Sequence, residues 1–526
     1  MCGWDGEGCA ARTRGAKNGN ARRFCPSSTS ESRGDDALRV ALIAPKWHEK
    51  ITDYPPLGLA YLAAVLERGG HEARIFDFGL RPHRPQQEDV ADVVAYAPAL
   101  IGFTVMTGGY HSVTEAIALL KQALPSVPIV LGGPHPTVFP EAVAADPGVD
   151  FVVYGEGEET LMELVAALES GAEDFSGIRG LAYAREGRVV RTPERPLIAD
   201  LDALPLPARH LLELDKYPLA APDGGKMLTV LSSRGCPFNC SYCFKGIVGR
   251  TYRQRSAQSV VDELRLLRNQ YNVRNFYFID DLFTINTKRL MAISQMIIDE
   301  GLDIRWQCLG RVDRVTPESL AMMYRAGCRE IHYGIESGNP QVLAATGKNI
   351  TMDQVRQAVK WTAESGIRSK GYFMLGLPGD TEETMEQTIR FACELELDEA
   401  MFSITTPFPG TRLWDELVKK RPETRYNADF TRAYYYNAYT EEIAPFLNVS
   451  EVSDSRLGKL ALIARRRFEE SRQRRRYLKA FGPRLGAVVW AISRVRPIRA
   501  LGRRLVRLGL FRRFASLRKE GKHAWA

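Results

Sequence analysis

Three cysteines in the middle of the chain define its most informative motif. Cys236, Cys240 and Cys243 follow the spacing C-x3-C-x2-C, which places three thiols in one short loop. Thiolates are the usual protein ligands of a [4Fe–4S] cluster, which takes four ligands. Three cysteines would therefore bind three irons and leave the fourth open to a chelating small molecule. The alternative is a structural zinc site, but such a site needs four ligands, and the next cysteine, Cys308, stands alone.

The residues around the cysteines narrow this prediction. Residues 230–235 have the pattern of a strand that runs into a loop, and Tyr242 places an aromatic ring directly before the last cysteine. The segment resembles the C-x3-C-x-aromatic-C signature of the radical S-adenosylmethionine (SAM) superfamily. The resemblance implies that the open iron binds the amino and carboxylate groups of SAM. An electron from the cluster would then cleave the sulfonium and give a 5′-deoxyadenosyl radical.

A parallel barrel is the element that must position this loop. Short apolar runs alternate with helical stretches such as 256–270 and 351–365, which is the pattern of βα units. The predicted strands are residues 275–280, 305–310, 330–335, 370–375 and 400–405. With the strand before the cysteines they make six βα repeats, which resembles the partial (βα)6 barrel of radical SAM enzymes.

The residues expected to bind SAM stand at the carboxyl ends of these strands, where barrels carry their chemistry. In the family, the segment after the second strand contacts the SAM amino group and polar residues of the fourth strand approach the ribose. We assign these roles to Asp280 and Glu336. For Gly376 a plain turn is an equally good interpretation. The residues predicted to bind SAM are Phe238, Tyr242, Asp280, Arg311, Glu336 and Gly376.

A second α/β domain precedes the barrel. Its predicted strands are residues 38–44, 72–78, 100–106, 128–131 and 150–154, with helices over 56–69 and 109–124 and from residue 159. This order predicts a doubly wound, Rossmann-like sheet, which binds ligands at the carboxyl ends of its strands. A dinucleotide is disfavoured, because the first strand runs into Ala44-Pro45-Lys46 without a G-x-G-x-x-G motif.

The glycines of this domain follow its later strands, where backbone without a side chain allows a bulky ligand to come close. Their order ahead of the barrel resembles the cobalamin-binding domain of B12-dependent radical SAM proteins. The D-x-H-x-x-G element that supplies a histidine to cobalt is missing, so we expect no protein histidine on the metal. The residues predicted to bind cobalamin are Pro56, Leu57, Gly58, Thr104, Thr107, Gly132, Gly133, His135, Gly155, Glu156 and Gly157.

The chain of 526 residues is long enough for both domains and two flanks. We expect a disordered extension over residues 1–36 and the cobalamin domain over 37–170. A linker over 171–222, the barrel over 223–425 and a basic helical extension over 426–526 follow. The first flank is rich in Gly, Ser, Arg and Asn, which favours disorder.

The C-terminal extension has a strong charge asymmetry. From Arg456 to Ala526 it contains 22 Lys and Arg against 3 Asp and Glu, a net charge of +19, whereas the whole chain carries +8. Leu, Val, Phe and Trp alternate with the arginines, and no apolar run approaches the ~20 residues that span a bilayer. Basic amphipathic helices bind membrane surfaces. Docking on the acidic remainder of the chain and nucleic-acid binding are the alternatives, and the second lacks an organised set of stacking aromatics.

The two cofactors together predict the activity. The main hypothesis is a cobalamin-dependent radical SAM C-methyltransferase that acts on an unactivated carbon. The alternative is an oxidative cyclase or rearrangement enzyme of the anaerobic magnesium-protoporphyrin ester cyclase type, and a third reading is a non-catalytic cobalamin sensor or carrier. A methylthiotransferase would need further cysteines in the first domain, yet residues 37–232 contain none.

The expected cofactors are a [4Fe–4S] cluster, SAM and cobalamin, and no side-chain acid or base is required beyond the cluster ligands. The expected partners are a small-molecule or lipid-like substrate and an external one-electron donor of the flavodoxin or ferredoxin type. Nine cysteines, three of them in the cluster motif, favour a reducing cytoplasm. A further expectation is that the basic tail contacts the inner face of the membrane.

Overall fold

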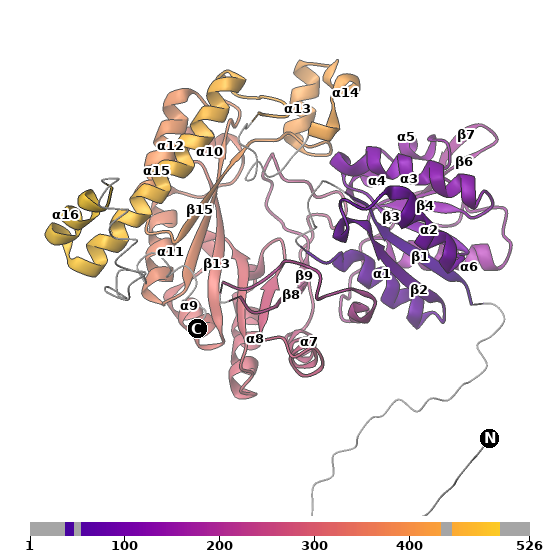
Figure 1. Ribbon diagram of the computed structural model, residues 1–526, viewed down its shortest axis with the longest axis horizontal. Coiled ribbons are helices and arrows are strands. Elements are labelled where there is room, and N and C mark those ends of the chain that lie inside the picture. The colour runs from indigo at the N-terminus through magenta and orange to yellow at the C-terminus, as the bar shows by residue number, and fades with distance from the viewer. Residues whose placement is uncertain (1–36, 47–53, 223, 433–443, 495–526) are drawn as a thin grey trace, which may run out of the picture. The chain divides into compact units, whose positions relative to one another are not determined.

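The computed structural model describes residues 37–46, 54–222, 224–432 and 444–494 (Figure 1). The predicted disorder of residues 1–36 and the end of the basic tail, residues 495–526, fall outside this part of the chain. The described residues form two large sheets with their helices and a two-stranded ladder, followed by two C-terminal helices.

The first sheet has the strand order β2-β1-β3-β4-β5-β6-β7. Strands β1 to β5 are parallel, as predicted, and β6 and β7 add an antiparallel hairpin. The strands are β1 (Arg39–Ala44), β2 (Glu72–Asp77), β3 (Leu100–Thr104), β4 (Ile129–Gly132), β5 (Phe151–Val153), β6 (Leu181–Arg185) and β7 (Arg188–Arg191). The hairpin lies in the segment expected to be a linker, so this sheet extends past residue 170.

Helices cover both faces of the first sheet because alternate residues of its strands point to opposite sides. On β1, Ala41 and Ile43 belong to one apolar core, whereas Val40 and Leu42 belong to another. The helices are α1 (Leu57–Arg68), α2 (Gln86–Tyr96), α3 (Tyr110–Ala123), α4 (Pro134–Val138), α5 (Pro140–Ala144) and α6 (Glu158–Glu169). The doubly wound prediction is confirmed, although α2 was not foreseen.

The second sheet is parallel throughout, with the order β15-β14-β13-β12-β11-β8. The strands are β8 (Met227–Val230), β11 (Asn275–Phe278), β12 (Arg305–Gly310), β13 (Cys328–Glu336), β14 (Arg368–Leu375) and β15 (Glu399–Ile404). Each strand follows its predecessor in both sequence and space, which is the order of an open barrel. The predicted partial (βα)6 architecture is therefore confirmed.

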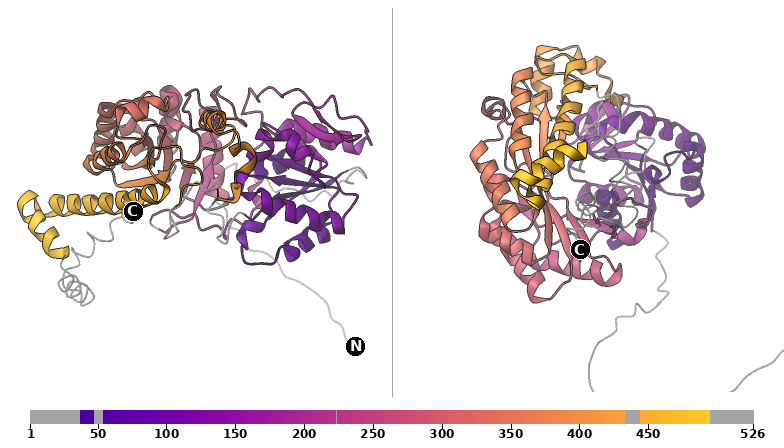
Figure 2. Two further views of the ribbon diagram at one scale, coloured as in Figure 1. Left: turned by 90° about the horizontal axis from the view of Figure 1, so that it is seen from above. Right: turned by 60° about the vertical axis from the view of Figure 1, so that its left-hand side comes forward.

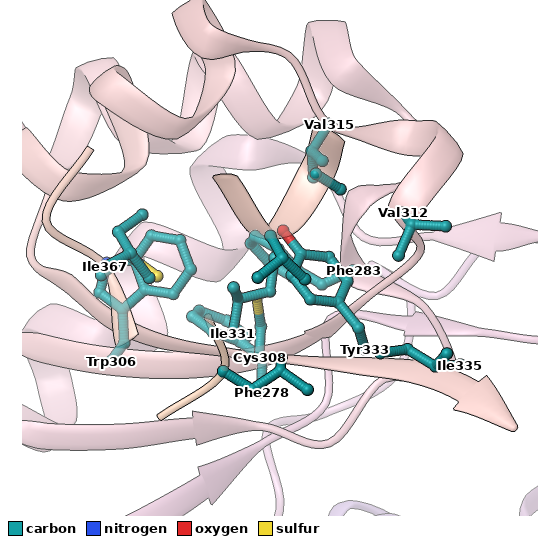
Figure 3. Close-up of a cluster of buried hydrophobic side chains, with 14 of the residues drawn as sticks. Phe278, Phe283, Trp306, Cys308, Val312, Val315, Ile331, Tyr333, Ile335 and Ile367 are labelled. Carbon is teal, nitrogen blue, oxygen red and sulfur yellow. The ribbon is translucent and has the colours of Figure 1, made fainter. Parts of the chain in front are cut away.

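The helices of the barrel pack against one face of this sheet. Figure 3 shows Ile331, Tyr333 and Ile335 of β13 in an apolar core together with Phe278 and Trp306. The helices are α7 (Ala257–Gln270), α8 (Thr287–Asp299), α9 (Pro317–Arg325), α10 (Pro340–Ala345), α11 (Met352–Glu364), α12 (Glu382–Glu394), α13 (Arg412–Lys420) and α14 (Thr424–Asn427). We call the opposite face, which carries the alternate residues of each strand, the inner face.

Short elements connect the larger ones. A two-stranded antiparallel ladder of β9 (Ser233–Arg234) and β10 (Arg253–Gln254) encloses the cysteine loop. Six 3₁₀ turns complete the described residues: η1 (Phe78–Leu80), η2 (Thr107–Gly109), η3 (Arg209–Leu211), η4 (Phe283–Ile285), η5 (Val312–Arg314) and η6 (Phe430–Arg432).

The C-terminal extension begins as part of the barrel. Helix α15 (Asp454–Phe481) runs along α12 (Figure 2), and its Leu457, Leu460 and Phe468 are buried in the barrel core. Its arginines pair with the body, for example Arg456 with Glu382 and Arg467 with Glu386. Docking is therefore the correct interpretation for this part of the extension. Helix α16 (Pro483–Arg494) follows, and none of the described helices is long and apolar enough to cross a membrane.

Candidate functional site

The cysteine loop leaves the sheet through a turn that only glycine can adopt without strain. Gly235 has φ +83°, and a Cβ there would lie 2.3 Å from the carbonyl oxygen of Thr251. A backbone hydrogen bond of 3.2 Å from Cys243 to Cys240 closes the end of the loop. All three cysteines are free thiols, half-buried at Cys236 and Cys240 and exposed at Cys243. Three accessible soft ligands in one loop fit a [4Fe–4S] cluster.

Hydrogen bonds also hold the cysteine loop to later parts of the barrel, the end of α10 and the start of α13. The Ser241 amide donates a 2.8 Å hydrogen bond to the Thr346 carbonyl, and the Leu413 amide donates one of 2.9 Å to the Ser241 carbonyl. A Cβ on Gly347 would lie 2.8 Å from the Asn239 carbonyl oxygen. The segment between α10 and α11 therefore packs directly on the cluster loop.

Two predicted SAM residues, Phe238 and Arg311, meet in the structure. The Arg311 guanidinium lies 3.8 Å from the centre of the Phe238 ring. Arg311 is buried, and its Nε donates to Asp313 at 2.7 Å while Nη2 donates to the carbonyl of Lys348. Arg311 thus connects β12, the cluster loop and the segment after α10.

Glu336 lies beside the same segment and forms an ion pair that the sequence did not reveal. Lys348 Nζ donates to Glu336 Oε1 at 2.9 Å. Burial disfavours the charged ammonium, but the Glu336 carboxylate outweighs that effect and raises the pKa of Lys348. A Cβ on Gly334 would lie 2.5 Å from Glu336 Oε1, so this glycine makes room for the pair. Lys348 follows a glycine in a loop between two helices, which is too weak a signal to have identified it.

Tyr242 lies next to this ion pair. Its ring hydroxyl is buried, and burial together with the charge of Glu336 raises the pKa of Tyr242 well above its ordinary value. Among the predicted SAM residues, Phe238, Tyr242, Arg311 and Glu336 are therefore gathered around the cluster loop.

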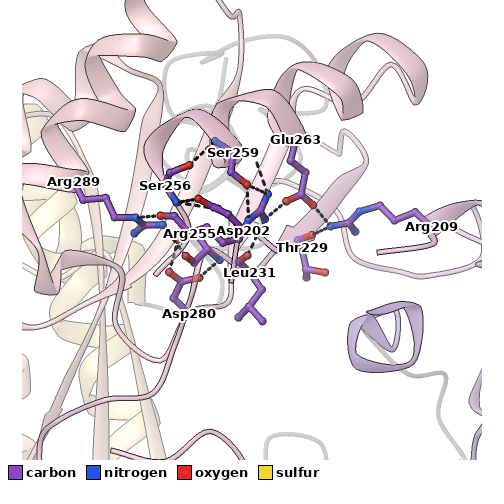
Figure 4. A network of polar contacts seen from close by, with 11 residues as sticks. Asp202, Arg209, Thr229, Leu231, Arg255, Ser256, Ser259, Glu263, Asp280 and Arg289 are labelled. Carbon is purple, nitrogen blue, oxygen red and sulfur yellow. Dashed lines mark hydrogen bonds and ion pairs between the residues drawn. The ribbon is translucent and has the colours of Figure 1, made fainter. Parts of the chain in front are cut away.

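Asp280 is part of a buried polar network that includes Arg289 (Figure 4), and its predicted contact with SAM stays a prediction. It is fully buried and accepts hydrogen bonds from the Ser232 amide at 2.6 Å, from Ser232 Oγ at 2.5 Å and from Ser233 Oγ at 2.6 Å. Arg289 donates to the Ser232 carbonyl at 2.7 Å. Both carboxylate oxygens are therefore committed to the strand that leads into the cysteine loop. The geometry supports a positioning role for Asp280.

Gly376 lies in a turn, which was the alternative interpretation of this glycine in the sequence. Its φ is +86°, its amide donates to Asp380 Oδ2 at 3.0 Å, and a Cβ would lie 2.9 Å from Leu457 of α15. The side of Gly376 on which a Cβ would stand is thus filled by the C-terminal helix.

The predicted cobalamin residues lie at the carboxyl edge of the first sheet. A Cβ added at Gly58 or at Gly155 would meet no atom within 4 Å, so backbone is left bare there. Thr137 Oγ1 donates to the Gly133 carbonyl at 2.8 Å and accepts from the Gly155 amide at 3.1 Å, which ties two of the loops together. These open glycine positions fit a large ligand such as a corrin. The other predicted positions at this edge are Pro56, Leu57, Thr104, Thr107, Gly132 and Gly157.

His135 is packed among aromatic rings. Its ring centre lies 4.3 Å from that of Tyr110 and 5.2 Å from that of Phe139. Burial lowers the pKa of His135 to about 4, because the charged imidazolium is poorly solvated there. The imidazole is therefore neutral at pH 7, and its contacts are those of a packed core side chain.

Glu156 is committed to a buried ion-pair cluster, which we call the latch. Glu156 accepts from Arg234 Nη1 at 2.8 Å and from Arg253 Nη1 at 2.8 Å, and Glu158 accepts from Arg234 Nη2 at 2.5 Å. The Ile198 amide donates to Glu156 at 2.8 Å. The latch joins the glycine loop after β5 to the β9–β10 ladder around the cysteines. Glu156 thus pairs with two arginines of the barrel, and its predicted contact with cobalamin stays a prediction.

Comparison with known proteins agrees with this arrangement. The radical SAM superfamily model matches residues 230–392, and the B12 binding domain model matches residues 51–165. An uncharacterized methyltransferase of Pyrococcus horikoshii is 39% identical over 72% of this chain and 83% of its own length. The anaerobic magnesium-protoporphyrin IX monomethyl ester cyclase of Rubrivivax gelatinosus is 32% identical over 73% of this chain and 70% of its own length.

A solved structure shows the same fold. The radical SAM methyltransferase TsrM from Kitasatospora setae, solved with cobalamin and a [4Fe–4S] cluster bound, superposes with a TM-score of 0.63. It is 23% identical and covers 73% of this chain and 75% of its own. The chain thus combines a cysteine triad on an open barrel with a glycine-lined edge on the preceding sheet. Together with these relatives, this shows that the chain belongs to the cobalamin-dependent radical SAM enzymes, whose cofactors are a [4Fe–4S] cluster, SAM and cobalamin.

Proposed function

We propose that the protein is a C-methyltransferase that adds a methyl group to an unactivated carbon of a small molecule. The observation that carries the proposal is the latch, because it couples a glycine-lined corrin edge to the β9–β10 ladder that holds the three cluster cysteines. Methyl transfer is also the activity that the uncharacterized methyltransferase of Pyrococcus horikoshii and the fold of the solved methyltransferase support best.

The bound cofactors would supply a 5′-deoxyadenosyl radical and a transferable methyl group, and the protein has to bind and orient them. Cys236, Cys240 and Cys243 hold the cluster. The Glu336–Lys348 pair and the Arg311–Phe238 contact line the adjoining SAM site. Open backbone at Gly58 and Gly155 receives the corrin. Asp280 keeps the strand before the cysteines in place.

The test is anaerobic reconstitution with cluster, hydroxocobalamin and SAM that carries a trideuterated methyl group, followed by mass spectrometry of extracts from the source cells. A methylated product should carry the three deuterons. One SAM should end as 5′-deoxyadenosine and a second as S-adenosylhomocysteine, in equal amounts. Formation of 5′-deoxyadenosine without S-adenosylhomocysteine would contradict methyl transfer.

Oxidative cyclisation is the second candidate, because 70% of the cyclase from Rubrivivax gelatinosus aligns with this chain at 32% identity. The product masses separate the two reactions. A cyclase removes hydrogen from its substrate and transfers no deuterated methyl group.

We also propose that α16 contacts an anionic lipid surface. Leu485, Val488 and Ile492 are 57%, 55% and 46% exposed, and their spacing places them on one face of the helix. Arg484 is the second residue of the same helix. Membrane-surface helices combine such a stripe with basic residues. The full chain should co-sediment with phosphatidylglycerol vesicles at low salt, and the Leu485→Ser/Val488→Ser/Ile492→Ser variant should not.

A further inference from the structure

A lysine side chain lies across the start of the cysteine loop. Lys245 stands two positions after the last cluster cysteine, and its Nζ donates a 2.8 Å hydrogen bond to the carbonyl of Cys236, the first one. The side chain therefore reaches from the end of the loop back to its beginning. It is half-buried, and its acceptor in this contact is a neutral carbonyl. A carbonyl does not cancel the charge of the ammonium, which therefore acts on whatever the loop holds.

An aspartate of opposite charge lies at the same end of the loop. Strand β11 pairs in parallel with β8, the strand before the cysteines, and the contact of Asp280 with Ser232 shows that the residues after both strands stay together. Asp281 is the next residue. Partial burial raises the pKa of Asp281, and the Lys245 ammonium and a hydrogen bond from the Gly235 amide oppose that rise. The carboxylate thus lies beside the residue that precedes the first cysteine.

Other charged side chains at this loop are paired or screened. Arg311 donates to Asp313 at 2.7 Å, and Lys348 donates to Glu336 at 2.9 Å. In each pair the two charges offset one another. Arg250 also contacts the loop, 3.5 Å from a backbone carbonyl, but it is exposed and water screens its charge. The lysine and the aspartate at the start of the loop are therefore well placed to act on a bound cluster.

Charge near an iron–sulfur cluster changes its reduction potential. One electron passes from an external low-potential donor to the cluster, which changes from the 2+ to the 1+ state while no bond forms or breaks. The reduced cluster is the more negative of the two states, so a nearby cation stabilises it and raises the potential, whereas a nearby anion lowers the potential. The potential must be high enough for the donor to reduce the cluster and low enough for the cluster to cleave SAM.

We propose that Lys245 and Asp281 set the reduction potential of the [4Fe–4S] cluster in opposite directions. Lys245 raises the potential and makes the cluster easier to reduce. Asp281 lowers it and keeps the reduced cluster a strong reductant. Both act on the cluster through space, as positioning residues. The inference concerns the cluster alone, so it goes beyond the proposed function and holds whichever reaction follows the cleavage of SAM.

The test is an anaerobic redox titration of the protein loaded with cluster and hydroxocobalamin, with dithionite as the reductant and the EPR signal of the reduced cluster as the readout. Lys245→Gln keeps a donor for the Cys236 carbonyl but loses the charge. At the midpoint potential of the wild type, its ratio of reduced to oxidised cluster should fall about tenfold, which is a shift of about 59 mV for a one-electron couple. In Asp281→Asn the ratio should rise about threefold, because this more exposed charge is screened more strongly.

Three further variants are the controls. Lys245→Arg keeps the charge and should titrate as the wild type does. Lys360→Gln and Asp299→Asn remove the same two charges from exposed positions of α11 and α8, and should leave the potential unchanged. The double variant Lys245→Gln/Asp281→Asn should have a potential between those of the two single variants.

The opposite signs make the outcome decisive, because a general disturbance of the loop would not separate them. Shifts in the same direction in Lys245→Gln and Asp281→Asn, or shifts no larger than those of the controls, would overturn the inference. If Lys245→Gln fails to hold the cluster, Asp281→Asn decides alone: a raised potential supports the inference, and an unchanged or lowered one overturns it. The titration contains no methyl acceptor, so its result is independent of methyl transfer, which is tested through S-adenosylhomocysteine.

Discussion

The helices of the two sheets begin in opposite ways. In the barrel, α7 to α13 each start at a Ser, Thr or Asn whose side chain accepts a hydrogen bond from the first turn. In the first domain, α1 to α6 start at Pro, Gly or Phe, and none of these residues caps its helix with a side chain. The helices follow their strands in both domains, so the difference is not one of topology.

The difference reflects where each domain holds its cofactor. Helix N-termini carry amide groups without intrahelical partners, and a side-chain cap satisfies one of them at the cost of filling the space in front. The barrel can cap its helices because its cofactor is held by thiols on a separate loop. The first domain leaves its helix starts without side-chain caps, and at Gly58 and Gly155 its backbone is open to a ligand that is bound by shape.

Loss of one cluster ligand should have the largest effect and should affect one domain only. Cys243→Ala should remove the broad visible absorbance of the cluster and all 5′-deoxyadenosine formation, because the three thiols are required together. Corrin retention should be unchanged. Cys393→Ala, at a half-buried thiol of α12, is the control and should keep both cofactors. Corrin loss in Cys243→Ala would contradict the view that the two domains hold their cofactors separately.

Removal of a latch carboxylate should be the next largest effect. Glu156→Gln leaves Arg253 without its buried counter-charge, whereas Arg234 keeps Glu158, and breaking a buried pair costs about 3–5 kcal/mol. Thermal unfolding should shift to lower temperature, and the segment over residues 171–222 should become more sensitive to protease. Glu159→Gln, whose exposed carboxylate pairs with Arg195, should change stability by less than about 1 kcal/mol. Equal sensitivity of the two variants would show that the latch does not join the domains.

A side chain at an open glycine should affect ligand binding more than folding. Gly58→Val fills space that is empty of protein atoms, so the apo-protein should keep its secondary structure and corrin affinity should fall by about tenfold. Gly177→Val is the matched control, since its Cβ also meets no atom within 4 Å but the residue is not among the predicted corrin contacts. Equilibrium dialysis with hydroxocobalamin measures both. Unchanged affinity in Gly58→Val would place the corrin elsewhere.

The smallest expected effect concerns the side-chain caps that distinguish the helices of the barrel from those of the first domain. Thr351 and Gln354 form a reciprocal capping box at the start of α11. Thr351→Ala should lower the free energy of unfolding of the barrel by about 1 kcal/mol, whereas Thr351→Ser should restore it. Corrin affinity should be the same in both, as judged by dialysis beside a thermal melt.

The sequence predicted the sheets well and the polar contacts poorly, for a physical reason. Alternating apolar runs and βα spacing depend on local periodicity, so every parallel strand of both domains was found. The cysteine motif is also local. Lys348, the partner of Glu336, and the arginine partners of Glu156 lie far from them in the sequence, and no local pattern predicts which charges will meet. Asp280 illustrates the same limit, because its two serine partners stand 47 and 48 positions earlier.

Helix α15 also packs against the edge strand of the open barrel. Within the described part of the chain, strand β15 pairs only with β14, and an unpaired strand edge is a template for association with another chain. Arg465 donates to the Phe402 carbonyl of β15, and Arg472 and Arg475 donate to the carbonyls of Asp398 and Leu397 just before it. The arginines of this helix thus occupy backbone acceptors that a second molecule could otherwise use. Part of the positive charge of the extension therefore protects the edge strand from pairing with another molecule.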